Sequence, residues 1–118
     1  MQHPDTISNL EPYFANEEVL AQTIEQLNKD AYPHMEFKWK TMSIDKYEDI
    51  VSQLAVGLEA MGRDQYEQLL SFLYRVDLPQ IEHNSLTNSD ERYLTLAKMV
   101  LNRELKKVLF RLFYKIKS

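Results

Sequence analysis

Apolar residues recur every three or four positions along most of this chain, which is the spacing of one face of an α-helix. Two glycines and four prolines in 118 residues also leave few places for the tight turns that sheets need. The sequence therefore predicts an all-α fold, a small four-helix bundle-like domain with a long C-terminal helix.

The first predicted helix begins after Asn16, whose side chain can cap the exposed amides of the first turn. Glu17 and Glu18 add favourable negative charge at that end, and Pro33 stops the helix. The positions expected to face the core are Leu20, Ile24, Leu27 and Ala31.

The pattern changes to strict alternation over residues 34–40, where Met35, Phe37 and Trp39 share one side. A single strand would leave both edges unpaired, so we expect an extended crossover that connects the first helix to the second. A strand paired elsewhere, or a helical continuation that starts at Pro33, are the alternatives.

The second helix is predicted from a cap at Ser43 to an end at Gly62. Its apolar stripe comprises Ile44, Tyr47, Ile50, Val51, Leu54, Leu58 and Met61. Asp64 and Glu67 predict a capping box for the third helix, which Pro79 closes. Its apolar positions are Tyr66, Leu69, Leu70, Leu73 and Val76.

The last helix is predicted to start near Asn88 or Ser89 and to be the longest. Its inward seam comprises Ala97, Leu101, Leu105, Val108, Leu112 and Ile116. We expect the second, third and last helices to form the core, with the first packed across them. Residues 1–13 are polar and aperiodic, so they are expected to form a loose or partner-ordered arm.

Composition indicates one domain over residues 1–118, since 44% of the residues are hydrophobic and 27% are charged. The absence of cysteine excludes a disulfide scaffold and a thiolate metal site. No apolar run is long enough for a membrane span, and no signal peptide is recognised at the start. A cytoplasmic protein is expected.

Charge is divided unevenly along the chain. Residues 98–118 hold seven basic residues against the single acid Glu104, while residues 1–97 hold seven against seventeen acids, so these parts carry +6 and −10. The acidic part could neutralise the basic helix internally, or the helix could face an external partner.

Angular positions on the last helix place its cations largely opposite the apolar seam, with Phe110 and Tyr114 among them. Aromatic and arginine side chains are typical anchors of protein interfaces. The leading hypothesis is a non-catalytic protein–protein interaction module, with a second copy of the chain as one partner. The candidate partner-binding residues are Trp39, Arg103, Lys106, Lys107, Phe110, Arg111 and Tyr114.

Two other function classes stay open. The basic helix could contact phosphates of a nucleic acid, although the net charge of −4 opposes a polyanion. A small enzyme would have to use Tyr74, Arg75 and Asp77 with His83. Neither a metal site nor a cofactor site is predicted, because no histidine has another histidine at a ligand spacing.

The C-terminal two fifths of the chain also resemble a known group of proteins. The residues that carry this resemblance are Leu69, Leu70, Leu73, Tyr74, Arg75, Val76, Asp77, Leu96, Ala97, Leu101, Arg103, Glu104, Lys107 and Arg111. This pattern resembles short all-helical bacterial proteins of uncharacterised function. The resemblance implies a bacterial origin and brings no activity, cofactor or catalytic residue.

Overall fold

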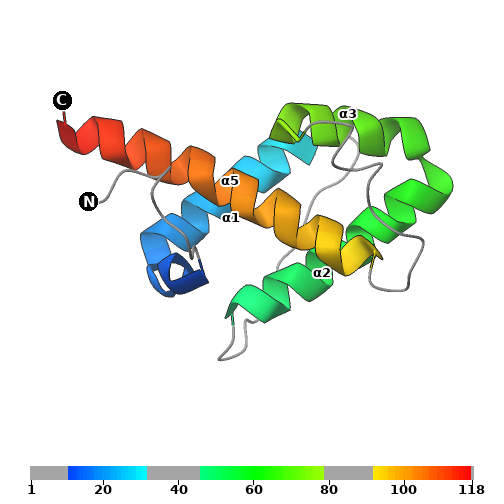
Figure 1. The fold of residues 1–118 in the computed structure, drawn as a ribbon, viewed down its shortest axis with the longest axis horizontal. Coiled ribbons are helices and arrows are strands. Elements are labelled where there is room, and N and C mark those ends of the chain that lie inside the picture. The colour runs from blue at the N-terminus through cyan, green and yellow to red at the C-terminus, as the bar shows by residue number, and fades with distance from the viewer. Residues whose placement is uncertain (1–10, 32–45, 79–91, 118) are drawn as a thin grey trace.

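A computed structural model of the chain describes residues 11–31, 46–78 and 92–117. These residues are helical apart from short connections, so the predicted all-α class is confirmed (Figure 1). The elements are η2 (Glu11–Ala15), α1 (Glu17–Ala31), α2 (Lys46–Asp64), α3 (Tyr66–Val76) and α5 (Arg92–Lys117).

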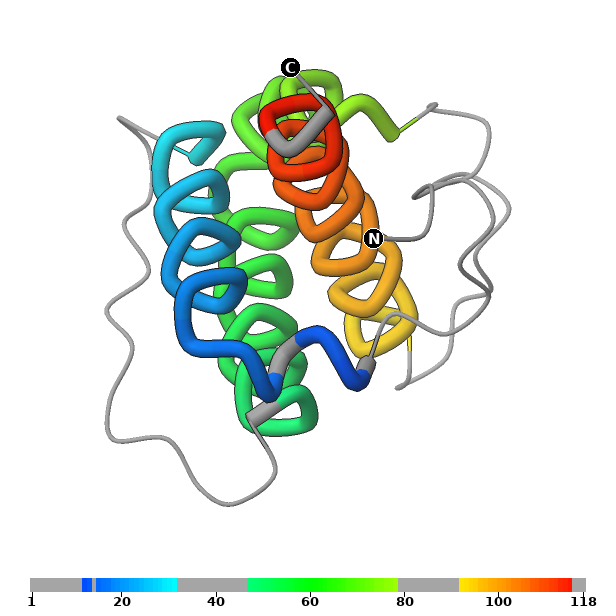
Figure 2. The backbone as a smooth tube through the Cα atoms, turned by 90° about the vertical axis from the view of Figure 1, so that its left-hand side faces the viewer, coloured from blue at the N-terminus to red at the C-terminus, as the bar shows by residue number. Residues whose placement is uncertain are grey.

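The long helix α5 is the centre of the arrangement. It packs against both α1 and α2, and α3 joins the end of the molecule at which α1 finishes (Figures 1 and 2). Figure 1 shows the C-terminal end of α5 reaching beyond the other helices along the long axis. Among the described residues, the last turns of α5 therefore have fewer neighbouring helices than its middle.

One hydrophobic cluster joins the four α-helices. Its fully enclosed large side chains are Leu27, Ile50, Leu54, Leu58, Met61, Leu69, Phe72, Leu96, Leu101, Leu105 and Leu109. Leu101, Leu105 and Val108 belong to the predicted seam of α5 and are buried, whereas Leu112 is half-buried. Amphipathic spacing thus identified most of the core.

The start of α1 is the predicted one. Asn16 Oδ1 accepts hydrogen bonds from the amides of Glu18 (3.0 Å) and Val19 (3.1 Å), which satisfies two donors that the helix itself cannot. The expected core-facing positions Leu20, Leu27 and Ala31 are buried, and α1 packs along α5, so α1 contributes to the same core as the other three helices.

The junction between α2 and α3 differs from the prediction at two positions. Gly62 does not end α2, because the Gln65 amide still donates to the carbonyl of Met61 (2.7 Å) and the helix runs to Asp64. Asp64 does not cap α3: the N-cap is Gln65, which makes no side-chain capping bond, and Asp64 accepts from Arg63 instead. A one-residue connection leaves no room for the capping box.

The end of α3 is fixed by Asp77, which takes a left-handed conformation with φ 72°. The Leu78 amide donates to the Leu73 carbonyl and the Asp77 amide to the Tyr74 carbonyl, the paired bonds of a Schellman motif. Leu78 packs on the core. The helix therefore ends three residues before Pro79.

The loose arm predicted for residues 1–13 is wrong for residues 11–13, whereas residues 1–10 lie outside the described residues. Glu11–Ala15 form the short helix η2, and Tyr13 packs against the core while its carbonyl accepts from the Asn16 amide (3.1 Å). Three other predictions fall outside the described residues: the conformation of 34–40, the Ser43 cap and the start of the last helix near Asn88.

Candidate functional site

An aromatic surface lies at the C-terminal end of α5. The rings of Phe110 and Tyr114 stack with centroids 6.2 Å apart and planes 12° apart, and Tyr114 is 56% exposed. Phe113, which is buried, lies nearly perpendicular to Tyr114, with 5.3 Å between the ring centroids. Tyr114 thus contacts both rings while more than half of its surface stays exposed.

Lys106 lies one helical turn before Phe110 and is half-buried, so Lys106, Phe110 and Tyr114 follow one line along the helix. We call these three residues the outer stripe. Arg111 is exposed and lines a cleft that it shares with residues of α1. Trp39, the remaining aromatic candidate, is outside the described residues.

Arg103 does not belong to this surface. Its Nη2 donates to Asp77 Oδ2 at 2.6 Å, and this hydrogen bond keeps the pKa of Asp77 below its ordinary value. The same aspartate ends α3 in the left-handed conformation. Arg103 therefore ties α5 to the end of α3, a pairing between residues 26 positions apart in the sequence.

Lys107 lies at the meeting point of three helices. Its Nζ is 3.2 Å from Asp30 Oδ2 on α1, 3.2 Å from Glu104 Oε1 on α5, and 2.8 Å from the carbonyl oxygen of Arg75 on α3. Its side chain is only 25% exposed. Lys107 is thus an internal cation, although the helical wheel places it opposite the seam.

Asp30 has further partners at this junction. The Gln26 amide nitrogen donates to both of its carboxylate oxygens, at 3.2 and 3.1 Å. The Arg75 guanidinium donates to its main-chain oxygen at 3.0 Å, so Arg75 satisfies a carbonyl at the end of α1 rather than one of its own helix. We call Asp30, Glu104 and Lys107 the polar cluster.

Glu104 is fully buried among the packed helices. Burial, and after it contact with Asp30 and the charge of that carboxylate, raise the pKa of Glu104 to about 8, while Lys107 acts in the opposite direction. Neither carboxyl oxygen makes a well-aligned hydrogen bond within the described part of the chain. The surroundings of Glu104 consequently favour its neutral form.

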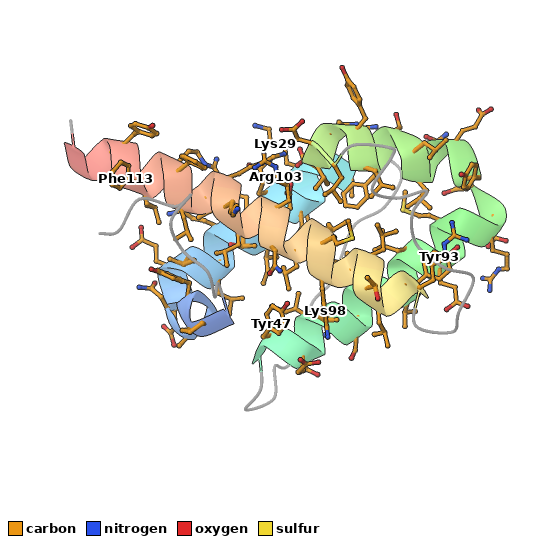
Figure 3. The ribbon with its side chains drawn as sticks, viewed as in Figure 1. Lys29, Tyr47, Tyr93, Lys98, Arg103 and Phe113 are labelled. Carbon is orange, nitrogen blue, oxygen red and sulfur yellow. The ribbon has the colours of Figure 1, made fainter. Side chains whose placement is uncertain are left out.

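The described residues of the enzyme candidate point in different directions. Arg75 and Asp77 are engaged with α1 and α5, as described above, whereas Tyr74 is 85% exposed on α3. His83 is outside the described residues. Figure 3 shows Arg103 and Lys29 near the crossing of α1, α3 and α5, where the polar side chains hold helix ends together.

A cleft of about 290 Å³ lies between α1 and α5. Its lining residues are Gln22, Glu25, Gln26, Lys29 and Arg111. Gln26 connects it to the polar cluster through its bonds to Asp30. Of the sequence-predicted candidates only Arg111 takes part, and the four α1 residues carry no pattern that sets them apart from an ordinary exposed helix face.

The described helices carry neither a metal-binding cluster nor a membrane-spanning segment. Among residues 11–31, 46–78 and 92–117, no group of three or more acidic or histidine side chains is placed to hold a metal ion. All three histidines lie outside these ranges. None of the helices in the described part has the length and apolar character needed to cross a bilayer.

No family model, no curated protein and no solved structure matches this chain. The resemblance to short helical bacterial proteins therefore stays a prediction.

Proposed function

We propose that this chain is a non-catalytic helical interaction module that binds a second copy of itself through the outer stripe. The observation that carries the proposal is the stacked pair of Phe110 and Tyr114, with Tyr114 56% exposed at the projecting end of α5. Large aromatic side chains have few rotatable bonds, so they lose little conformational entropy on binding, and they are frequent interface anchors.

Two copies of the outer stripe are complementary when their α5 helices run antiparallel. In an antiparallel pairing of two α5 helices centred on Phe110, Lys106 of one copy lies opposite Tyr114 of the other, because both are four residues from the centre. An ammonium group over a tyrosine ring is a favourable contact. A two-fold dimer forms this contact twice.

Charge is the main obstacle to such a pairing, because residues 98–118 carry +6. Two of these cations are compensated within the same copy, since Arg103 pairs with Asp77 and Lys107 with Asp30. This internal pairing lowers the repulsion between two copies. It also removes two cations that a nucleic acid would use, which favours a protein partner over phosphates.

The dimer is tested by sedimentation equilibrium over a range of concentrations. We expect concentration-dependent dimerisation, and about tenfold weaker dimerisation for Lys106→Met, because two cation–π contacts of about 0.5–1 kcal/mol each are lost. Lys98→Met is the matched control, since Lys98 is an exposed lysine on the same helix. Equal dissociation constants for the two variants would contradict the Lys106 contact.

A second pair of variants tests the aromatic anchor. Tyr114→Ala should weaken the dimer strongly, whereas Tyr74→Ala removes an even more exposed tyrosine from α3 and should leave it unchanged. Because the chain has no cysteine, Lys106→Cys mixed with Tyr114→Cys reports the antiparallel register through a short bis-maleimide cross-link. A chain that is monomeric at every concentration refutes the proposal, and salt-sensitive binding of an oligonucleotide would then favour the nucleic-acid alternative.

A further inference from the structure

The cleft between α1 and α5 places two cations on opposite walls. Lys29 extends from α1 and Arg111 from α5, and both are exposed. Within residues 11–31, 46–78 and 92–117, neither forms an ion pair. This distinguishes them from Arg103 and Lys107, which have carboxylate partners, and leaves two positive groups directed at one small cleft.

The rest of the lining supplies hydrogen-bond acceptors. Glu25 is exposed and has no ion pair within the same ranges. The amide nitrogens of Gln22 and Gln26 donate to Glu18 (3.2 Å) and to Asp30, so their carbonyl oxygens are the groups left for a ligand. Carbonyl and carboxylate oxygens accept hydrogen bonds from an ammonium group.

We propose that this cleft binds a small zwitterion that carries one carboxylate and one primary ammonium group, the chemistry of an amino acid. The carboxylate lies between Lys29 and Arg111, and the ammonium group faces Glu25 and the two glutamine carbonyls. A simple anion would interact with Lys29 and Arg111 but gain nothing from Glu25, and a simple cation would be repelled by the two basic side chains, so only a zwitterion uses all three charges. The site lies beside the outer stripe and does not depend on the proposed dimer.

The size of the cleft limits the ligand further. At about 290 Å³ it lies at the lower limit of small-molecule sites, so a compact molecule of a few carbon atoms is the appropriate class. Its charged groups are solvent-exposed, and exposed ion pairs contribute little free energy each. Millimolar dissociation constants are therefore expected, which is within the range of titrations followed by NMR.

Three probes of equal chain length separate the charge requirements. β-Alanine carries both groups, propionate carries only the carboxylate, and propylamine carries only the ammonium group. In titrations followed by ¹H–¹⁵N correlation spectra, we expect β-alanine to change the amide chemical shifts of residues 22–29 and 107–111. We also expect it to bind several times more tightly than either single-charge probe. Equal affinity for all three probes, or no shift in these two segments, would overturn the proposal.

Variants assign each charge to a residue. Arg111→Gln and Lys29→Gln should each raise the dissociation constant for β-alanine by about threefold, which is the effect of losing one exposed ion pair. Glu25→Gln should remove the preference for β-alanine over propionate, because the repulsion of the anion and the attraction of the ammonium group disappear together. Lys98→Gln is the control and should change nothing. An unchanged preference in Glu25→Gln would refute the assigned orientation.

Discussion

At the scale of a single residue, the ionisation of Glu104 depends on the packing around its carboxyl group. An ionised carboxyl group in a packed interior loses its hydration, so the neutral form is favoured. The polar cluster is also balanced in charge only while Glu104 holds its proton, because Asp30 contributes one negative and Lys107 one positive charge. The folded chain therefore retains this proton over a pH range in which the unfolded chain releases it.

The sign of the resulting pH dependence follows from proton binding. The pKa of Glu104 is raised from 4.5 to about 8, so between these values the folded state binds more protons than the unfolded state. The free energy of unfolding therefore falls as the pH rises through this window, by up to about 1.4 kcal/mol per pH unit. Below about pH 4.5, where Glu104 is protonated in both the folded and the unfolded chain, its contribution to the free energy of unfolding no longer changes with pH.

Glu104→Gln should remove this dependence, because the amide has nearly the same shape and never ionises. We expect urea unfolding of the variant and the parent to give similar stabilities near pH 4.5, and the variant to become increasingly more stable up to about pH 8. Glu25→Gln, an exposed substitution, serves as the control. Parallel stability curves for parent and Glu104→Gln would show that Glu104 ionises normally.

At the scale of the helical elements, the end of α2 shows packing overriding local propensity. Alanine is favoured over glycine inside a helix by about 1 kcal/mol. At Gly62, however, an added Cβ would overlap the hydroxyl of Tyr93 and lie 3.1 Å from its Cζ. An alanine at this position would therefore make the Tyr93 ring shift, and the close approach of α2 to the start of α5 is visible only once the two helices are packed together.

Gly62→Ala should therefore destabilise the parent by about 1 kcal/mol despite its better helix propensity. In a Tyr93→Phe background, which lacks the overlapping hydroxyl, the cost of Gly62→Ala should shrink by about 1 kcal/mol. A double-mutant cycle measured by urea unfolding gives this interaction energy directly. If Gly62→Ala costs the same in both backgrounds, the hydroxyl contact is not the cause.

Helix boundaries were predictable where the signal is local. The Asn16 cap is confirmed because the residue bonds to amides two and three positions away. The capping box at Asp64 is wrong, since α2 runs on through that residue and occupies the backbone that the box needs. The left-handed Asp77 had no signal in the sequence as strong as a glycine at that place would have been.

At the scale of the whole molecule, Lys107 joins three helices that are distant in sequence. It contacts Asp30 on α1 and the Arg75 carbonyl on α3 from its position on α5. Lys107→Met should reduce the free energy of unfolding by about 2 kcal/mol, because a nearly buried carboxylate and a carbonyl lose their donor. Urea unfolding at pH 7 measures this loss.

Lys98→Met provides the comparison for that variant, since it removes an exposed lysine from the same helix and should change stability by less than about 0.5 kcal/mol. Adding Asp30→Asn to Lys107→Met should restore part of the stability, because no buried charge is then left unpaired. No recovery in the double variant would mean that the cost of Lys107→Met does not come from an unpaired charge on Asp30.

The sequence by itself determined the helical class, most of the core and the aromatic line at the end of α5, because each depends on spacing within one helix. Only the tertiary structure decided which cations face outwards. Arg103 and Lys107 share the periodicity of Lys106 and Arg111, yet their partners Asp77 and Asp30 come from other helices. Long-range pairing of this kind, like the burial of Glu104, depends on how the helices cross, and a periodic pattern within one helix contains no information about that crossing.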